Sequence, residues 1–122
     1  FRKITMLEGS STDERIAEQV RSIASSHEKI IVLLDSCHTE EHVLREMEIY
    51  SPLVSAGSYL VVYDTLVEFE DKPHTDRPWG KGNNPYTAVQ KFLLMHDEFS
   101  VDEEIEQKIV ITSCPGGWLR RR

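Results

Sequence analysis

Cysteine is scarce in this sequence: Cys37 and Cys114 are the only two. Two cysteines are too few for the disulfide framework of a small secreted domain, and reduced thiols in a cytoplasmic protein are the simpler interpretation. The sequence also lacks an apolar run long enough to cross a bilayer, and no signal peptide opens it. These absences exclude a disulfide-rich scaffold and predict a cytoplasmic chain without a transmembrane segment.

A basic excess is missing as well. The 14 Lys and Arg residues are outnumbered by 21 Asp and Glu, so the formal net charge is −7 at pH 7. A surface that binds nucleic-acid phosphates needs clustered positive charge, so this balance argues against a nucleic-acid partner. The one basic cluster, Arg120–Arg122, ends the chain in the manner of a tail. The chain begins with Phe1 rather than methionine, which indicates a shortened amino terminus.

One stretch, Ile30–Asp64, can organise a single domain of 122 residues. Two short, β-branched apolar runs, Ile30–Leu34 and Tyr59–Val62, flank an amphipathic segment. Strands that are apolar throughout are typical of a parallel sheet buried on both faces, and the segment between them is long enough for a crossover helix. The pattern predicts a right-handed βαβ unit whose helix starts near Thr39 and stops at Pro52.

Further elements are predicted on both sides of this unit. They are a strand at Ile4–Leu7, a helix opened by a Ser11–Glu14 capping box, a helix capped by Asn84-Pro85, a strand around Phe99 and Val101, and a strand at Lys108–Ser113 ended by Pro115-Gly116-Gly117-Trp118. The acidic stretch Asp102–Glu106 is expected to be a solvated bend, and residues 65–84 a long functional loop. The order β-α-β-α-β-loop-α-β-β predicts an α/β sheet whose last two strands form a hairpin.

Asp35 and Asp64 each follow one of the two predicted parallel strands. Open α/β sheets place their ligands at the carboxyl edge of such strands, where both carboxylates would emerge. Carboxylate oxygens suit a hard cation such as Mg²⁺, with Thr65 as a further ligand. His38 could reach over the same edge and accept a proton from a substrate hydroxyl. Alternatively, each aspartate caps a helix or turn, and His38 faces solvent at the start of a helix.

A second metal pattern overlaps this site. The run His38-Thr39-Glu40-Glu41-His42 fits H-x-x-E-H, in which two histidines on one helix face bind zinc in a class of hydrolases. The fit weakens if His38 precedes the helix, as its position shortly after a strand indicates.

Two further segments could contact a ligand. Gly9–Thr12 lies between a predicted strand and a helix amino terminus, where backbone N–H groups and hydroxyls can hold a polar molecule. An ordinary capped turn would have the same composition, and no glycine fingerprint of a dinucleotide or phosphate loop is present. In the long loop, Trp79 and Asn83 could cover a substrate, with Arg77 and Lys81 near an anionic group. Alternatively, the tryptophan and the prolines only anchor the loop.

Three strings carry a resemblance to a known family. They are VLLDSCHTEEHVLREMEIYSPLVSAGSYLVVYDT (residues 32–65), RPWGKGNNPYTAVQKFL (77–93) and KIVITSCPGGWLRR (108–121). The chain resembles the cephalosporin hydroxylases and rhamnosyl O-methyltransferases, which are S-adenosylmethionine-dependent enzymes on the Rossmann-like class I methyltransferase fold. It is similar, more distantly, to the catechol-type metal-dependent O-methyltransferases. The resemblance runs from about Ile4 to Arg121. It implies that residues 1–122 are the carboxyl-terminal portion of one methyltransferase domain, with a final antiparallel strand pair and the first two strands absent.

The resemblance also implies roles for individual residues. Asp35 and Asp64 match the family's Mg²⁺ carboxylates, and Thr65 stands where the catechol-type enzymes have an asparagine ligand. Tyr63 stands where some relatives carry a further acidic residue, and His38 where relatives have a proposed base. The implied cofactor-binding residues are Gly9, Ser10, Ser11 and Thr12, which match the turn that contacts the adenine, with Ser36 and Cys37 beside them. The implied activity is transfer of a methyl group from S-adenosylmethionine to a hydroxyl of a sugar, a glycolipid or an antibiotic-type substrate.

Two parts of the family pattern are absent: the glycine-rich loop after the first strand and the acidic residue after the second, which carry much of the cofactor binding. About half of the enzyme is therefore missing, and we expect these 122 residues alone to bind S-adenosylmethionine weakly or not at all. Sheet edges left open would favour a homo-oligomer. Two other classes remain open, a non-catalytic α/β binding or assembly module and a zinc hydrolase that uses His38, Glu41 and His42.

Overall fold

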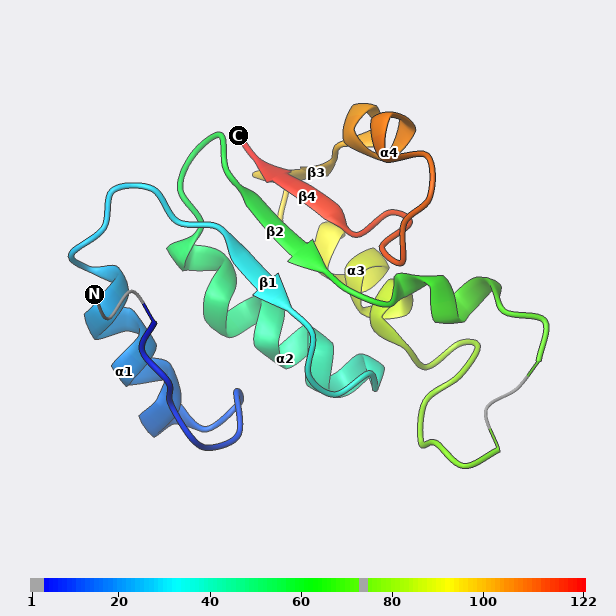
Figure 1. Ribbon diagram of the computed structural model, residues 1–122, viewed down its shortest axis with the longest axis horizontal. Helices are drawn as coiled ribbons and strands as arrows, with labels where there is room; N and C mark the ends of the chain where they lie inside the picture. Colours follow the sequence, from blue (N-terminus) through cyan, green and yellow to red (C-terminus); the bar gives the residue numbers. More distant parts are fainter. Residues whose placement is uncertain (1–3, 73–74) are drawn as a thin grey trace.

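The computed structural model describes residues 4–72 and 75–122 and shows a small α/β fold (Figure 1). The helices are α1 (Glu14–Ala24), α2 (Glu40–Tyr50), α3 (Pro85–Leu93) and α4 (Glu103–Ile109). The strands are β1 (Val32–Leu34), β2 (Tyr59–Val62), β3 (Phe99–Val101) and β4 (Trp118–Arg121), and two short 3₁₀ helices are η1 (Ser51–Leu53) and η2 (Thr65–Phe69). Within these described ranges, every helix is too short or too polar to cross a membrane.

The four strands form one mixed sheet in the order β1-β2-β4-β3. Strands β1 and β2 are parallel, with Leu34 opposite Val62, and α2 connects them, so the predicted βαβ arrangement is confirmed. Strand β4 runs antiparallel to both β2 and β3, so the last two strands do pair with each other. The outer strands of the described sheet are therefore β1 and β3.

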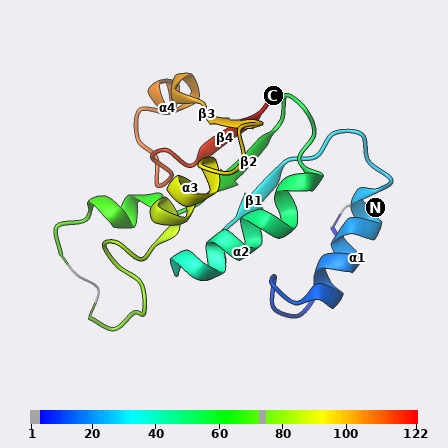
Figure 2. The same cartoon turned by 180° about the vertical axis from the view of Figure 1, so that it is seen from behind.

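The core lies between the sheet and the helices α2 and α3, which cover the same face (Figure 2). Both layers contribute large side chains without exposed surface, among them Met47, Leu60, Phe92 and Leu119. Burying a side chain of this size stabilises the fold by about 1.5–3 kcal/mol relative to leaving it exposed. On β1, in contrast, Leu33 is 55% exposed, because strand alternation points it away from α2.

The prediction for the amino-terminal segment is wrong in two details. Residues 4–7 form no strand, and the Ile4 and Met6 side chains are exposed. A strand needs a neighbour for its backbone hydrogen bonds, and no described strand lies beside this segment to provide them. Helix α1 is capped by Asp13, whose carboxylate accepts a hydrogen bond from the Arg15 N–H, and not by a Ser11 capping box.

The predicted strand at Lys108–Ser113 is also wrong, because α4 occupies its first residues and the last strand is β4. The acidic stretch Asp102–Glu106 is the start of this helix rather than a bend. The Asp102 carboxylate caps α4 by accepting from the Ile105 N–H, and the acidic side chains suit the positive end of the helix dipole. Pro115–Trp118 accordingly leads into the final strand instead of ending one.

The predicted loop over residues 65–84 is more ordered than its sequence indicates, although residues 73–74 lie outside the described ranges. It begins with η2, and the Glu68 carboxylate in η2 accepts hydrogen bonds from the Gly82 N–H and the Asn84 side-chain amide. These donors lower the pKa of Glu68. Asn84 also caps α3 through a capping box, which confirms the predicted start of that helix.

His96 joins α2 to the segment between α3 and β3. Its Nε2 lies 3.1 Å from both carboxylate oxygens of Glu48 in α2, and its Nδ1 lies 3.2 Å from Glu98. Burial lowers the pKa of His96, but the hydrogen bonds to Glu48 and Glu98 together outweigh it, so this pKa is raised above 6.5. The two carboxylates therefore favour the protonated form of the imidazole.

A raised pKa in the folded state means that protonation of His96 stabilises the fold. This contribution is fully present below about pH 6.5 and is lost as the pH rises through the pKa of the folded state. We expect the free energy of unfolding in urea to fall across this window, and to fall less in a His96→Gln variant. His27→Gln, which changes an exposed histidine, is the matched control. Equal pH profiles for His96→Gln and the parent would contradict the assignment.

Candidate metal centre

Two aspartates lie at the carboxyl ends of the parallel strands. Asp35 directly follows Leu34 at the end of β1, and Asp64 comes two residues after Val62 at the end of β2. The Tyr63 N–H donates to the Leu34 carbonyl over 3.0 Å, so the pairing continues up to the residue before Asp64. Both aspartates therefore emerge at one edge of the sheet, as their spacing predicts.

Asp35, His38 and Asp64 form a compact group of potential ligands. Each offers one ligand atom, and these atoms all lie within 4.8 Å of one another. Across residues 4–72 and 75–122, this is the one group of three His, Cys, Asp or Glu side chains with such spacing. The closest pair is His38 Nε2 and Asp64 Oδ2, 2.7 Å apart. Two carboxylates and an imidazole fit a divalent cation that keeps further positions for water or a substrate oxygen.

The backbone at Asp64 is left-handed, with φ 55° and ψ 28°. Such a conformation costs free energy in a residue other than glycine, although aspartate tolerates it better than most, and it is often found at functional sites. Segment 113–117, which we call the brace, holds the chain on both sides of Asp64. Its carbonyls accept three hydrogen bonds: Gly117 from the Val62 N–H (2.9 Å), Pro115 from the Thr65 hydroxyl (2.8 Å) and Ser113 from the Leu66 N–H (3.3 Å).

Thr65 follows Asp64 but is used differently in this structure. The residue is fully buried, and its hydroxyl proton is donated to the brace at Pro115. The contact shows Thr65 holding the turn that carries Asp64. Its role as a metal ligand stays a prediction.

His38 and Trp79 form part of one wall of a pocket of about 250 Å³ beside Asp64. The two ring centroids lie 4.9 Å apart with an interplanar angle of 33°, and the Arg77 guanidinium lies 5.3 Å from the Trp79 ring centroid. The imidazole is thus held by a carboxylate at one nitrogen and by an aromatic ring at its face. The structure therefore brings together the predicted base, the second aspartate and one predicted substrate-binding residue.

Asn83, the other predicted substrate-binding residue, makes contacts within the protein. Its side-chain oxygen accepts from the Glu40 N–H at the start of α2 (3.0 Å), and its amide nitrogen donates to the Pro78 carbonyl (3.1 Å). Thr39, the residue preceding α2, makes no side-chain capping bond, so Asn83 provides this cap from a distant part of the chain. Nothing in the sequence near residue 39 could indicate this contact, because the two segments are more than 40 residues apart.

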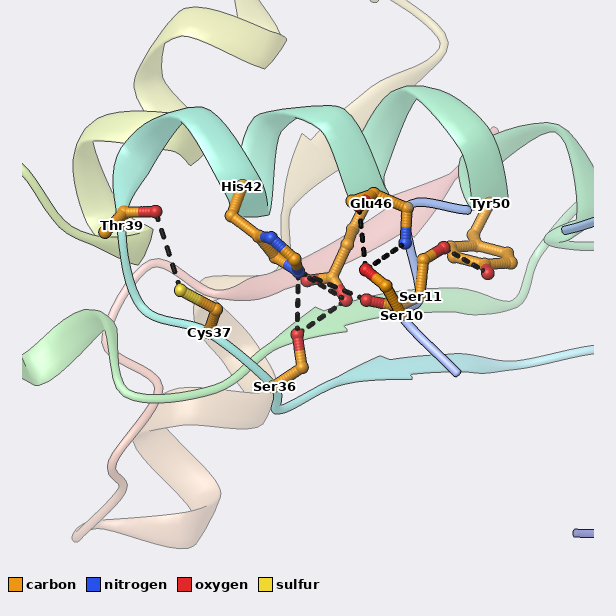
Figure 3. Close-up of polar contacts among 9 residues, drawn as sticks. Ser10, Ser11, Ser36, Cys37, Thr39, His42, Glu46 and Tyr50 are labelled. Carbon is orange, nitrogen blue, oxygen red and sulfur yellow. Dashed lines mark hydrogen bonds and ion pairs between the residues drawn. The ribbon is translucent and has the colours of Figure 1, made fainter. Parts of the chain in front are cut away.

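The residues predicted to contact the cofactor lie in two turns, and Figure 3 shows Ser10 and Ser11 of one turn and Ser36 and Cys37 of the other along the same face of α2. In the first turn, Gly9 has φ 151° and passes close to Ile16, while the Ser10 and Thr12 hydroxyl oxygens lie 3.0 Å apart. In the second, Cys37 Sγ lies 3.6 Å from the Thr39 hydroxyl oxygen. Ser11 and Ser36 both contact His42 of α2, so the structure does connect the two turns.

Three side chains of this region were not predicted as site residues: His42 in this context, Glu46 and Tyr50. They recur every four residues and hence share one face of α2, and that spacing is the one signal the sequence offers for them. From the sequence alone, this face looks like part of an ordinary amphipathic helix, because the apolar residues of α2 dominate its periodicity.

The zinc-hydrolase pattern is not supported by the geometry. His38 lies before α2 and contacts Asp64, whereas His42 contacts Ser11 and Ser36. Among the described residues, His42 belongs to no group of three potential ligands with metal-site spacing. The two histidines thus have separate partners.

Comparison with known proteins agrees with the resemblance seen in the sequence. The sequence model of the family "Rhamnosyl O-methyltransferase/CmcI" matches residues 1–122. Rhamnosyl O-methyltransferases of Mycobacterium tuberculosis (strain ATCC 25618 / H37Rv) and Mycobacterium bovis (strain BCG / Pasteur 1173P2) are 41% identical over 123 residues, covering 97% of this chain and 47% of the relative. The Mycobacterium leprae (strain TN) protein of that name is 36% identical over 121 residues, covering 98% and 51%.

The chain spans about half the length of the curated relatives it matches. No solved structure matches it. Because the family model covers every residue, the chain belongs to the rhamnosyl O-methyltransferase/CmcI family.

Proposed function

We propose that the chain is the carboxyl-terminal portion of a Rossmann-like O-methyltransferase domain that uses S-adenosylmethionine and Mg²⁺. The names of the relatives support methyl transfer to a hydroxyl oxygen, for which S-adenosylmethionine is the donor that the family implies. The sheet order β1-β2-β4-β3, with one parallel and two antiparallel pairs, is compatible with such a domain. The single observation that carries the metal dependence is the Asp35–His38–Asp64 group.

The donor set of this group fits Mg²⁺ through its two carboxylates. A divalent cation bound there supplies positive charge that polarises an acceptor hydroxyl and lowers its pKa. Asp35 and Asp64 would hold the ion from the ends of two paired strands, and the brace keeps the second of them in place. Thr65 would contribute through a lone pair of its hydroxyl oxygen, since its proton is donated to Pro115.

In this proposal, His38 takes the proton of the acceptor hydroxyl. An ionised carboxylate has only acceptors, so the 2.7 Å contact with Asp64 requires the hydrogen on His38 Nε2. The lone pair of the neutral imidazole is then on Nδ1, which is the nitrogen that can accept a proton. Asp64 fixes this tautomer and stabilises the imidazolium that forms, as a carboxylate does in other carboxylate–histidine pairs.

The acceptor is proposed to be a hydroxyl of a sugar, a glycolipid or an antibiotic-type molecule, in line with the word "rhamnosyl" in the relatives' names. The aromatic face of Trp79 beside His38 supports a substrate with an apolar ring face, and Asn83 would position the loop rather than the substrate. The cofactor would contact Gly9–Thr12, Ser36 and Cys37. An association of two copies through the outer strands β1 and β3 is part of the same proposal.

The metal dependence is tested by titrating the chain with Mg²⁺ while recording tryptophan fluorescence. In a Trp118→Phe variant, Trp79 is the one remaining tryptophan of the chain. Its ring lies next to the His38 ring, which belongs to the Asp35–His38–Asp64 group. We expect a saturable change in emission, competed by Mn²⁺. A spectrum that stays constant up to millimolar Mg²⁺, together with a folded chain of defined oligomeric state, would instead support a non-catalytic binding or assembly module.

A further inference from the structure

Helix α2 carries three polar side chains at intervals of four residues, His42, Glu46 and Tyr50, and each of them contacts one or both of the two turns described above (Figure 3). The Tyr50 hydroxyl donates to the Ser11 carbonyl over 2.6 Å. His42 Nε2 lies 3.2 Å from the Ser11 hydroxyl oxygen and 3.3 Å from that of Ser36. The Ser36 hydroxyl in turn donates to Glu46 Oε1 over 2.7 Å.

Glu46 is the unusual member of this network. It is 2% exposed, and its Oε2 has no hydrogen-bond partner among the described residues. His42 Nε2 is 3.6 Å from its other oxygen, too far for a good hydrogen bond. Burying a carboxylate with one oxygen unpaired destabilises a fold, and an apolar side chain of similar size would avoid that cost. Stability alone therefore does not account for a carboxylate at this position.

The contact with Glu46 determines what Ser36 can offer to a ligand. A hydroxyl has one proton, and here that proton is donated to the carboxylate, so Ser36 presents lone pairs to its surroundings. A cavity of about 470 Å³ lies between α1, β1 and α2. Its polar lining residues are Ser11, Asp35, Ser36, Glu46 and Tyr50, and the rest of its lining is apolar, including Val20, Ile30 and Val32. Within this lining, the buried Glu46 carboxylate orients the Ser36 hydroxyl.

We propose that Glu46 is a positioning residue that fixes the Ser36 turn against the Gly9–Thr12 turn through His42 and makes Ser36 a hydrogen-bond acceptor. The ligand of this cavity would then present an N–H or O–H donor to Ser36. Identifying that ligand with the methyl donor rests on the proposed function. The coupling of the two turns rests only on the contacts named above.

The proposal is tested by amide hydrogen exchange and by the imidazole ¹⁵N resonances of His42. Glu46→Leu keeps the volume but removes the acceptor, so we expect exchange in both turns to accelerate by about tenfold, the effect of losing one hydrogen bond to a charged group. The His42 resonances should shift as well. Glu46→Gln keeps an oxygen that can accept from Ser36 and should restore exchange to within about twofold of the parent.

Two further variants make the result specific. Ser36→Ala removes the same hydrogen bond together with the Ser36–His42 contact but keeps the buried carboxylate, and it should accelerate exchange in both turns and shift the His42 resonances even if Glu46→Leu fails to fold. Tyr50→Phe removes only the bond to the Ser11 carbonyl and should accelerate exchange in the Gly9–Thr12 turn alone. Unchanged exchange and unchanged His42 resonances in folded Glu46→Leu or Ser36→Ala would overturn the proposal. These measurements use neither Mg²⁺ nor cofactor. Their outcome therefore tests the role of Glu46 independently of the proposed metal centre.

Discussion

Replacing Asp64 by asparagine is expected to lower the affinity of the chain for Mg²⁺ by at least about 100-fold. Removing a residue that only supports a metal ligand typically lowers metal affinity by about 10–100-fold. Removing the charge of a ligand itself should lower the affinity by at least the larger of these factors. Asparagine suits this test because it has the size of aspartate and also tolerates the left-handed conformation that residue 64 adopts. The fold should therefore survive while the site loses half of its carboxylate charge.

The measurement is the Mg²⁺ titration of Trp79 fluorescence, with thermal unfolding as a check on the fold. Asp35→Asn should reduce affinity similarly, since Asp35 supplies the other carboxylate of the group. Glu41→Gln is the matched control, because it removes one negative charge from an exposed position near the start of α2, outside the group. Affinity within about twofold of the parent in Asp64→Asn would show that the ion does not use this carboxylate.

The grouping of Asp35, His38 and Asp64 was predictable from sequence because it depends on local patterns. Two apolar runs separated by an amphipathic segment define parallel strands, and residues that follow parallel strands share an edge of the sheet. Asp35 and Asp64 were found in this way, and His38 followed from its nearness to Asp35. The left-handed backbone of Asp64 carried no such signal, because the brace that holds it comes from residues about 50 positions away.

The strand predicted at Lys108–Ser113 is an example of a local pattern that predicts the wrong secondary structure. Its β-branched residues favour a strand, but the Asp102 cap and the acidic first turn begin a helix that continues to Ile109. The network around Glu46 was missed for a related reason. A carboxylate on an amphipathic helix is normally solvated, and only the fold shows that this one is buried and accepts a hydrogen bond from the Ser36 turn. Side chains that join distant segments are determined by tertiary packing, which single-sequence periodicity does not contain.

Gly117→Ala is expected to destabilise the chain by about 3 kcal/mol, the upper end for forcing an extra methyl group into a packed site. Gly117 lies in the brace, where its carbonyl accepts the Val62 N–H at the end of β2. A Cβ atom at this position would collide with the Val62 carbonyl oxygen and lie 3.2 Å from both Cys114 Cβ and the Cys114 carbonyl oxygen. Two of these neighbours are backbone atoms, which cannot turn away as the end of a flexible side chain can.

Relief of this collision has to move either the brace or the end of β2, and Asp64 follows β2 by two residues. The variant should therefore lose Mg²⁺ affinity as well as stability, although residue 117 is no ligand in the proposed site. Gly80→Ala is the control, because a Cβ atom at Gly80 meets nothing within 4 Å and its φ is not in the left-handed range. Urea unfolding and the Mg²⁺ titration measure the two effects. If Gly117→Ala matched Gly80→Ala in both, the brace would not be what holds Asp64 in position.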